Sequence, residues 1–227
     1  MIATWPAPLE NGKQAEELLL AFDQDRERRV LILPAWFDEA NKLRRFTVET
    51  MRALDAAGID SFLPDLPGCN DSLVPLENQT IAGWRTLAVA AAQYVKATHV
   101  LTIRAGALIA PKDLPGWDYA AQTGPKQLRG MIRARTIAAR EAGREETSER
   151  LLEIGRQEGL ILAGWHIGPA MLAELETDAP AENPVRVAIA QKRLGGGGLW
   201  LRAEPDEDAG QAAALAAIIA SDEDRAS

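Results

Sequence analysis

The stretch that decides the fold is HVLTIRAGALIA, residues 99–110. Its first five residues form a short apolar run with β-branched side chains, which predicts a buried strand. Small residues follow, and we expect residues 105–110 to start a helix that Pro111 ends, because proline removes a backbone N–H and clashes inside a helix. The stretch therefore predicts a strand that turns directly into a helix.

The same alternation of strand and helix extends in both directions along the chain. We expect strands at 17–22, 30–33, 61–63, 99–103, 117–122, 185–190 and 198–201. We expect helices at 40–57, from Thr80 to about residue 91, at 168–177 and at 210–220. This order predicts an α/β fold with a mostly parallel central sheet covered by helices on both faces, in which VLIL, SFLP, HVLTI and VRVAIA lie in one sheet and HVLTI is central.

Residues 126–158 interrupt this alternation. They are strongly helical and rich in Arg and Glu, and their apolar positions form only a narrow stripe. We expect a reduced helical cap inserted into a single domain that spans residues 1–227, with DEDRAS at 222–227 as a solvated tail. The four glycines at 195–198 precede a predicted strand rather than a helix, and no Lys-Ser/Thr pair follows them, so a phosphate loop is not expected there.

Composition excludes several classes of function. Lys+Arg number 25 against 33 Asp+Glu, which gives a net charge of -8 and argues against a nucleic-acid or anionic-membrane partner. No apolar stretch reaches the roughly 20 residues of a membrane-spanning helix, so we expect no membrane insertion. The first residues lack the basic region and the apolar run of a secretory signal, and we expect a cytoplasmic protein. The oligomeric state stays open.

Cysteine and histidine are scarce. Cys69 is the single cysteine, and His99 and His166 are the two histidines, so we expect neither a metal site nor a cofactor. Without a neighbouring histidine in the sequence, Cys69 is expected to be a packed turn residue. Both histidines are expected to be structural or surface residues, although His166 could face a cleft.

Two landmarks resemble the α/β-hydrolase fold. DLPGCNDS, residues 65–72, resembles the loop that follows strand 4 of that fold, and residues 99–110 lie where the fold places its nucleophile elbow. An elbow needs small neighbours because the strand turns sharply into the helix, and Thr102, Ala105 and Gly106 are small. In the Gly-x-Ser-x-Gly frame the nucleophile position is Arg104. We expect Asp65 to fix the turn of its loop through backbone amides.

Together with PAWFDEANKLRRF (34–46), LILAGWHIGPAML (160–172) and LWLRAEPDED (199–208), these motifs resemble the exosortase A system-associated hydrolase 2 family. That resemblance implies a link to bacterial exopolysaccharide biosynthesis or export. The chain departs from the family pattern at Leu43, where the family has Ser, and at Asn70 and Thr102, where it has Gly. The departure at Thr102 predicts a tighter elbow.

The residue types at the three triad positions do not match Ser-type hydrolysis. Arg104 cannot act as a nucleophile because its guanidinium stays protonated. The predicted strand at 185–190 is followed by Gln191, Lys192 and Arg193 instead of an acid, and the one at 198–201 by Arg202, Ala203 and Glu204 instead of a histidine. We therefore expect a non-catalytic binding or scaffolding protein rather than a serine esterase.

An alternative is an active ester or thioester hydrolase that uses a non-standard nucleophile. Its sign would be Ser61 or Ser72 beside His166.

Arg104 itself has two interpretations. It could bind a carboxylate or phosphate of an anionic small molecule or a glycan precursor, since strand ends and helix N-termini favour anions. It could instead be neutralised by an internal carboxylate, because a buried cation is costly without one. We expect Glu204 to be that carboxylate, with Glu39 and Asp71 as reserve candidates, because these loops open at the same edge of the sheet.

Overall fold

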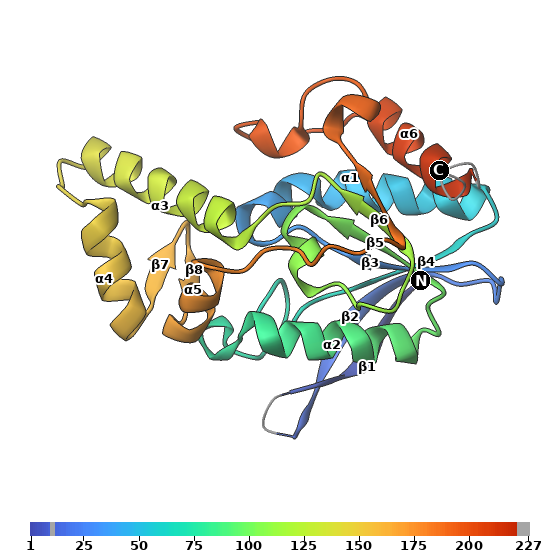
Figure 1. The fold of residues 1–227 in the computed structure, drawn as a ribbon, viewed down its shortest axis with the longest axis horizontal. Coiled ribbons are helices and arrows are strands. Elements are labelled where there is room, and N and C mark those ends of the chain that lie inside the picture. Colours follow the sequence, from blue (N-terminus) through green and yellow to red (C-terminus); the bar gives the residue numbers. More distant parts are fainter. Residues whose placement is uncertain (10–11, 222–227) are drawn as a thin grey trace.

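The computed structural model describes residues 1–9 and 12–221, so the expected tail at 222–227 lies outside the described residues. A seven-stranded sheet runs through its centre in the order β1-β2-β4-β3-β5-β6-β9 (Figure 1). The strands are β1 (Ile2–Pro8), β2 (Gln14–Phe22), β3 (Arg29–Leu33), β4 (Asp60–Pro64), β5 (His99–Ile103), β6 (Gly116–Tyr119) and β9 (Arg186–Ile189). The neighbours β4, β3, β5, β6 and β9 pair parallel, and β2 pairs antiparallel with β1 and β4. The mostly parallel sheet and the central position of β5 confirm the prediction.

Helices cover both faces of this sheet. They are α1 (Phe37–Ala56), α2 (Ile81–Tyr94), α3 (Gly124–Glu141), α4 (Ser148–Glu158), α5 (Pro169–Leu175) and α6 (Ala209–Ala220), with short 3₁₀ helices η1 (Leu76–Asn78), η2 (Arg104–Ile109), η3 (Gln191–Arg193) and η4 (Leu199–Leu201). In Figure 1, α1 and α6 lie on one side of the sheet and α2 on the other. The helical layers explain why the central strands are apolar on both faces.

Alternate residues of β3 show this two-sided burial. Leu31 and Leu33 pack with the core on the α2 side, whereas Val30 and Ile32 pack with the core on the α1 and α6 side. All four are fully buried. Successive side chains of a strand point to opposite faces, so a continuous apolar run is what a central parallel strand requires.

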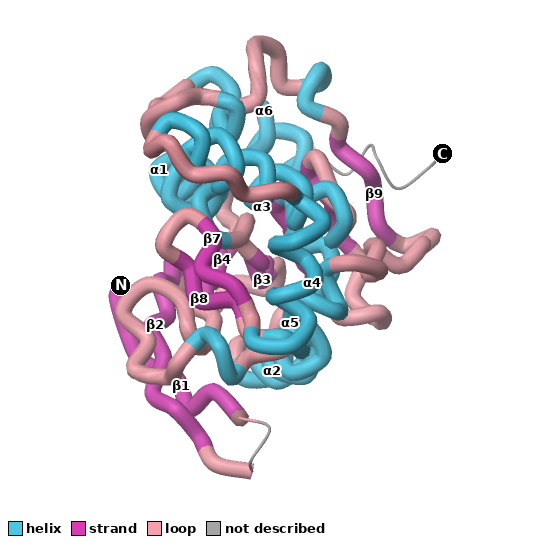
Figure 2. The backbone as a smooth tube through the Cα atoms, turned by 90° about the vertical axis from the view of Figure 1, so that its left-hand side faces the viewer, coloured by secondary structure: helices cyan, strands magenta, loops and turns pink. Residues whose placement is uncertain are grey.

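A separate group of elements lies between β6 and β9 in the chain. It consists of α3, α4, the hairpin β7 (Leu160–Leu162) with β8 (Trp165–Ile167), and α5. Figures 1 and 2 show these elements together at one end of the molecule, and Figure 2 views them in front of the sheet. The predicted helical region at 126–158 corresponds to α3 and α4, and the hairpin that follows was not predicted.

Two local features differ from the predictions. The strand β1, which contains two prolines, was not predicted. Residues 198–201 are not a strand, because the preceding glycines form a loop that leaves the sheet after β9 and Leu199–Leu201 then form η4. The helix expected at 105–110 is present before Pro111, as the 3₁₀ helix η2. Among the described residues, no helix has the length and apolar character to cross a membrane.

Candidate functional site

The junction of β5 and η2 has the geometry of a sharp elbow. The strand ends at Ile103, and Arg104 adopts the left-handed conformation with φ 56°. Such a conformation costs a residue with a side chain on the order of 1 kcal/mol, and it concentrates at functional sites. A Cβ at Gly106 would lie 2.3 Å from the carbonyl oxygen of Leu33, so the backbones of η2 and β3 approach closely and require glycine. The predicted strand-turn-helix elbow is present.

Four of the five N–H groups of the Arg104 guanidinium are engaged by the protein. Nε donates to Oε2 of Glu39 at 2.9 Å, and Nη2 donates to Oε1 of the same carboxylate at 3.0 Å. Nη1 donates to the carbonyl oxygen of Ala120 at 2.9 Å, and Nη2 also donates to Oε1 of Gln122. The guanidinium carbon lies 4.1 Å from the ring centroid of Trp200. The arginine head is therefore held on several sides.

The bidentate ion pair of Arg104 and Glu39 is largely shielded from water. The two side chains are 14% and 15% exposed. Glu39 lies in the first turn of α1, where the helix dipole favours a negative charge. Burial raises the pKa of Glu39, and the neighbouring Arg104 acts in the opposite direction. Because the two charges neutralise each other inside the protein, the elbow presents no free cation.

The predicted partner of Arg104 was wrong. Among the described residues, the carboxylate paired with Arg104 is Glu39, one of the two reserve candidates. Glu204 is exposed beyond η4, because that 3₁₀ helix places the ring of Trp200 rather than Glu204 over the guanidinium. The other reserve candidate, Asp71, is exposed and lines a neighbouring cavity.

The loop that follows β9 is held by a network of amides. The hydroxyl of Tyr119 donates to Oε1 of Gln191, and Nε2 of Gln191 donates to Oε1 of Gln211 at 2.9 Å. The carbonyl oxygens of Gly195 and Gly197 also accept from Gln191 Nε2, at 3.1 and 3.3 Å. The glycine loop thus turns carbonyl oxygens toward these side chains. Such acceptors do not suit a phosphate.

The other nucleophile candidates are held in structural contacts. Ser72 Oγ donates to Oε1 of Glu17 at 2.7 Å, and Ser61 is fully buried in β4 with no hydrogen-bond partner among the described residues. His166 is exposed on β8 and does not contact either hydroxyl through a hydrogen bond in the described part of the chain. Burial raises the pKa of Cys69 to about 12, which leaves almost no thiolate at neutral pH.

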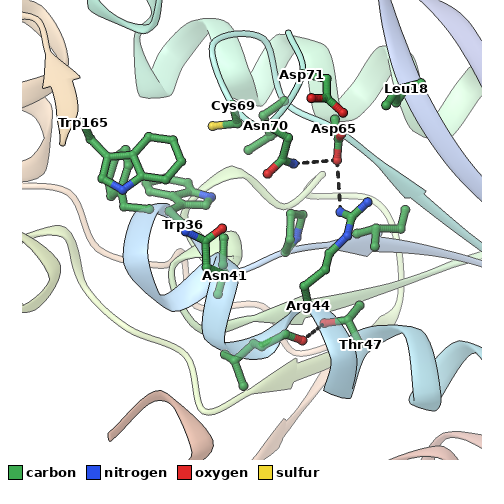
Figure 3. A pocket seen from close by; sticks show the side chains of 17 residues that line it. Leu18, Trp36, Asn41, Arg44, Thr47, Asp65, Cys69, Asn70, Asp71 and Trp165 are labelled. Atoms are coloured by element: carbon green, nitrogen blue, oxygen red, sulfur yellow. Dashed lines mark hydrogen bonds and ion pairs between the residues drawn. The ribbon is translucent and has the colours of Figure 1, made fainter. Parts of the chain in front are cut away.

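A cavity of about 260 Å³ opens beside the elbow, where β3 and β4 end (Figure 3). Asp65 lines it and is 3% exposed. Its Oδ1 accepts from Nη1 of Arg44 at 3.1 Å and from Nδ2 of Asn70 at 2.8 Å. Asp65 therefore accepts hydrogen bonds from side chains, and the predicted contacts with backbone amides were wrong.

The other lining residues come from four elements and the loops between them. They are Leu18, Pro34, Ala35, Trp36, Phe37, Ala40, Asn41, Leu43, Thr47, Leu63, Leu66, Cys69, Asp71 and Trp165. No role was predicted for Trp36, Arg44 or Trp165. An aromatic residue next to an apolar strand is indistinguishable from a core residue in one sequence, so no sequence signal identifies the two tryptophans.

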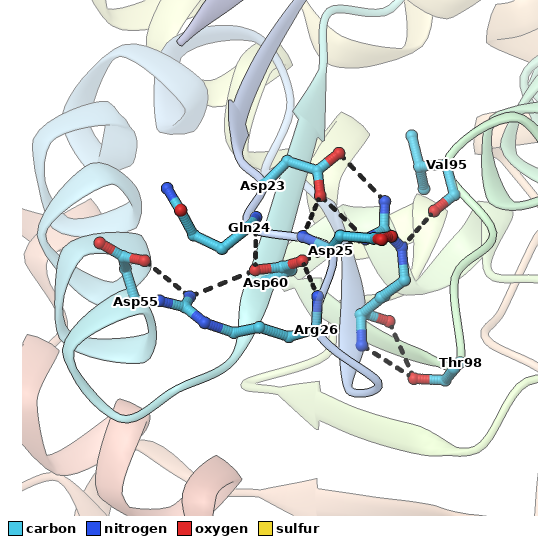
Figure 4. A network of polar contacts seen from close by, with 9 residues as sticks. Asp23, Gln24, Asp25, Arg26, Asp55, Asp60, Val95 and Thr98 are labelled. Carbon is cyan, nitrogen blue, oxygen red and sulfur yellow. Dashed lines mark hydrogen bonds and ion pairs between the residues drawn. The ribbon is translucent and has the colours of Figure 1, made fainter.

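A second polar cluster lies at the opposite end of the strands, where β3 and β4 begin (Figure 4). Asp60 at the start of β4 is fully buried and accepts from Nη1 of Arg26 at 3.2 Å and from Nη1 of Arg29 at 3.0 Å. The backbone N–H groups of Gln24 and Arg26 also donate to it, at 3.1 and 2.9 Å. Because protein donors satisfy both oxygens, this cluster serves to join the strand ends and the preceding turn.

No protein-family model matches this sequence, and no curated protein matches it either. Among solved structures, the chain is similar to mouse alpha/beta hydrolase domain-containing protein 10, with 12% identity, a TM-score of 0.59 and full coverage of both chains. It is also similar to a putative hydrolase from Agrobacterium vitis S4, with 17% identity, a TM-score of 0.45 and coverage of 55% of this chain and 54% of that one.

The esterase domain of a Rhodothermus marinus protein is a further match, with 16% identity, a TM-score of 0.39 and coverage of 58% of this chain and 55% of that one. The chain thus spans about half the length of the bacterial proteins it matches. At these identities the likeness establishes the fold alone. Together with the strand order, the full-length match shows that the protein has an α/β-hydrolase fold.

Proposed function

We propose that this α/β-hydrolase-fold chain is a binding protein that does not hydrolyse esters by a serine mechanism. The observation that carries the proposal is the bidentate pair of Arg104 and Glu39 at the elbow, which is the position that α/β-hydrolases give to the nucleophile. A guanidinium cation has no free lone pair and does not attack a carbonyl carbon. The residues after β9 also lack the acid of a triad, and among the described residues no strand follows β9 in the sheet to place a triad histidine after it.

The same pair argues against an anionic ligand at the elbow. A ligand carboxylate or phosphate would have to displace the Glu39 carboxylate, which already accepts two hydrogen bonds from Arg104. Removing one partner of a shielded pair leaves an uncompensated charge, which costs about 3 to 5 kcal/mol. The structural interpretation of Arg104 is therefore favoured over the anion-binding one, and the ligand site of the proposal is the cavity beside the elbow.

We propose that the 124–175 segment is a cap on a single domain. Its hairpin residue Trp165 lines the cavity, and the Trp165 ring centroid lies 5.7 Å from that of Phe37 at the start of α1. The segment thus contributes Trp165 to the wall of the cavity, and α1, the strands β2 and β4, and the loops after β3 and β4 contribute the rest. This extends the cap expected at 126–158 to include α5 and the β7–β8 hairpin. From its resemblance to the exosortase A-associated hydrolase 2 family, we propose a role for the protein in bacterial exopolysaccharide biosynthesis or export. We also propose that the protein is cytoplasmic.

Two assays test the absence of serine hydrolysis. A serine-directed fluorophosphonate should not label the native chain, and short p-nitrophenyl acyl esters should not be turned over above the buffer rate. A serine esterase serves as the positive control, and Ser72→Ala serves as the matched variant. Stoichiometric labelling at any serine, or turnover that a single point mutation abolishes, would establish the alternative of an active ester or thioester hydrolase.

A further inference from the structure

The helix α3 concentrates positive charge in an otherwise acidic protein. It contains five Lys and Arg residues and a single acid, Glu141, whereas the rest of the chain contains 20 Lys and Arg against 32 Asp and Glu. Three of the cations, Lys126, Arg129 and Arg133, are three and four residues apart and therefore lie on one face of the helix. All three are exposed to solvent. We call these three side chains the basic stripe.

No internal carboxylate compensates the basic stripe. Within residues 1–9 and 12–221, neither Lys126, Arg129 nor Arg133 forms an ion pair, whereas Arg135 on the same helix pairs with Glu146 at 2.7 Å. Like charges one turn apart on a helix repel each other. The positive end of the helix dipole adds to this repulsion at Lys126, which lies in the first turn of α3. An anion bound from outside would relieve both effects.

A groove between α3 and α4 runs beside the basic stripe. Its volume is about 430 Å³, and Arg129 and Arg133 line it. The half-buried side chains of Pro125 and Leu152 line it as well, and the methylene stems of the two arginines extend this apolar surface. Figure 1 shows α3 and α4 at the end of the molecule away from the sheet. The groove therefore combines an apolar surface with two cations on an accessible part of the cap.

The surface around the groove is acidic. Glu176 also lines the groove, but Arg156 already pairs with it at 2.6 Å. Glu141, Glu149 and Glu153 are exposed on α3 and α4. A broad anionic surface, such as a membrane or a nucleic-acid backbone, would meet these carboxylates and the net charge of -8. A single chain segment covers far less surface, so it can contact the basic stripe without them.

We propose that the groove between α3 and α4 binds an acidic amphipathic helix of a protein partner. Arg129 and Arg133 are four residues apart, so they match two carboxylates that are one turn apart on a helix. Pro125 and Leu152 would contact the apolar face of that helix. The lining residues of α3 extend from Pro125 to Thr136, about 17 Å or three helical turns. This surface is on the cap and apart from the cavity beside the elbow, so the inference goes beyond the proposed function and does not depend on it.

The test is a fluorescence-anisotropy titration of a labelled peptide with the full chain. The peptide has about 16 residues, as two copies of LEELAEEL, which places leucines on one face of a helix and glutamates on the other. We expect a Kd of about 10 to 100 µM in about 50 mM NaCl, because the interface is small. The same peptide with glutamine in place of every glutamate should bind at least about tenfold more weakly, since it offers no counter-charge.

Two double variants locate the binding site. Arg129→Gln combined with Arg133→Gln should weaken binding of the acidic peptide at least about tenfold. Arg45→Gln combined with Arg150→Gln is the matched control, because these arginines are 65% and 67% exposed and do not line the groove. The control removes the same net charge and should change the Kd by less than about twofold. Thermal unfolding of both variants identifies any folding defect.

Three results would overturn the inference. The first is the absence of saturable binding of the acidic peptide, and the second is an equal loss of affinity in the two double variants. The third is co-sedimentation with vesicles containing about 30% phosphatidylserine that only the groove variant loses, without peptide binding, which would assign the basic stripe to a membrane. Labelling by the fluorophosphonate is read separately, so failure of this inference is distinguishable from failure of the proposed non-hydrolytic function.

Discussion

Replacing Arg104 with alanine tests the interpretation of the elbow most directly. The change removes the two hydrogen bonds to Glu39, the contacts to Ala120 and Gln122, and the stacking on Trp200. The Glu39 carboxylate then stays shielded from water but has lost the positive charge that neutralises it. Alanine keeps the same left-handed backbone strain, so the comparison isolates the side chain.

The expected loss follows from the exposure of the pair. Breaking a buried ion pair by removing one partner costs about 3 to 5 kcal/mol. Arg104 and Glu39 are still 14% and 15% exposed, so we expect the lower end, about 3 kcal/mol. For a chain of this size, that loss lowers Tm by about 6 to 12 °C.

Urea denaturation followed by circular dichroism measures the loss, with an unchanged m-value as the condition for comparing the variants. Arg150→Ala is the control, because the Arg150–Glu153 pair has a similar spacing, 2.7 Å against 2.9 Å for Arg104–Glu39, but its side chains are 67% and 57% exposed. That variant should change the free energy of unfolding by less than about 0.5 kcal/mol.

A double-mutant cycle of Arg104→Ala with Glu39→Gln should give a coupling energy of at least about 1 kcal/mol. Equal stability losses in Arg104→Ala and Arg150→Ala, or a loss below about 1 kcal/mol at Arg104, would refute the account of the elbow as a closed ion pair.

Further predictions concern the thiol, the acid stability and the elbow backbone. Cys69, with its pKa raised to about 12, should resist iodoacetamide at about pH 8 in the native protein and react after denaturation, as read by mass spectrometry; equal rates in the two states would contradict this. Arg29 lowers the pKa of Asp23 from 3.8 to about 2, so the ionised form stabilises the fold above pH 3.8, and that contribution is lost as the pH falls toward 2. The stability difference between the native chain and Asp23→Asn should therefore shrink over that window, and a constant difference would exclude the pair as its cause. Gly106→Ala places a Cβ 2.3 Å from a backbone oxygen at the end of β3 and should destabilise the fold by more than about 2 kcal/mol. Gly130→Ala is the control, because Gly130 on α3 has open space around it and this variant should not be destabilised in the same way. Similar unfolding midpoints for the two variants would show that the backbones of η2 and β3 are not in close contact.

The sequence by itself determined the class of the fold and the presence of an arginine, rather than a nucleophile, at position 104. Continuous apolar runs such as 30–33 and 99–103 are a local property, and only a central strand covered on both faces satisfies them. The residue type at Arg104 is equally local, because a guanidinium stays protonated in any fold. The N-terminal strand escaped prediction because the prolines of β1 are typical of an edge strand, and pairing rather than propensity forms it.

Tertiary structure alone decided which groups meet. Arg104 and its partner Glu39 are 65 residues apart, and a rule based on strand order could not choose between Glu39 and Glu204. The choice depends on η4, which places the ring of Trp200 against the Arg104 guanidinium and leaves the Glu204 side chain exposed to solvent. The cavity likewise joins Trp36 from the end of β3 to Trp165 from a distant hairpin. Contacts between distant segments depend on how loops and helices pack, and one sequence carries no local signal for that packing.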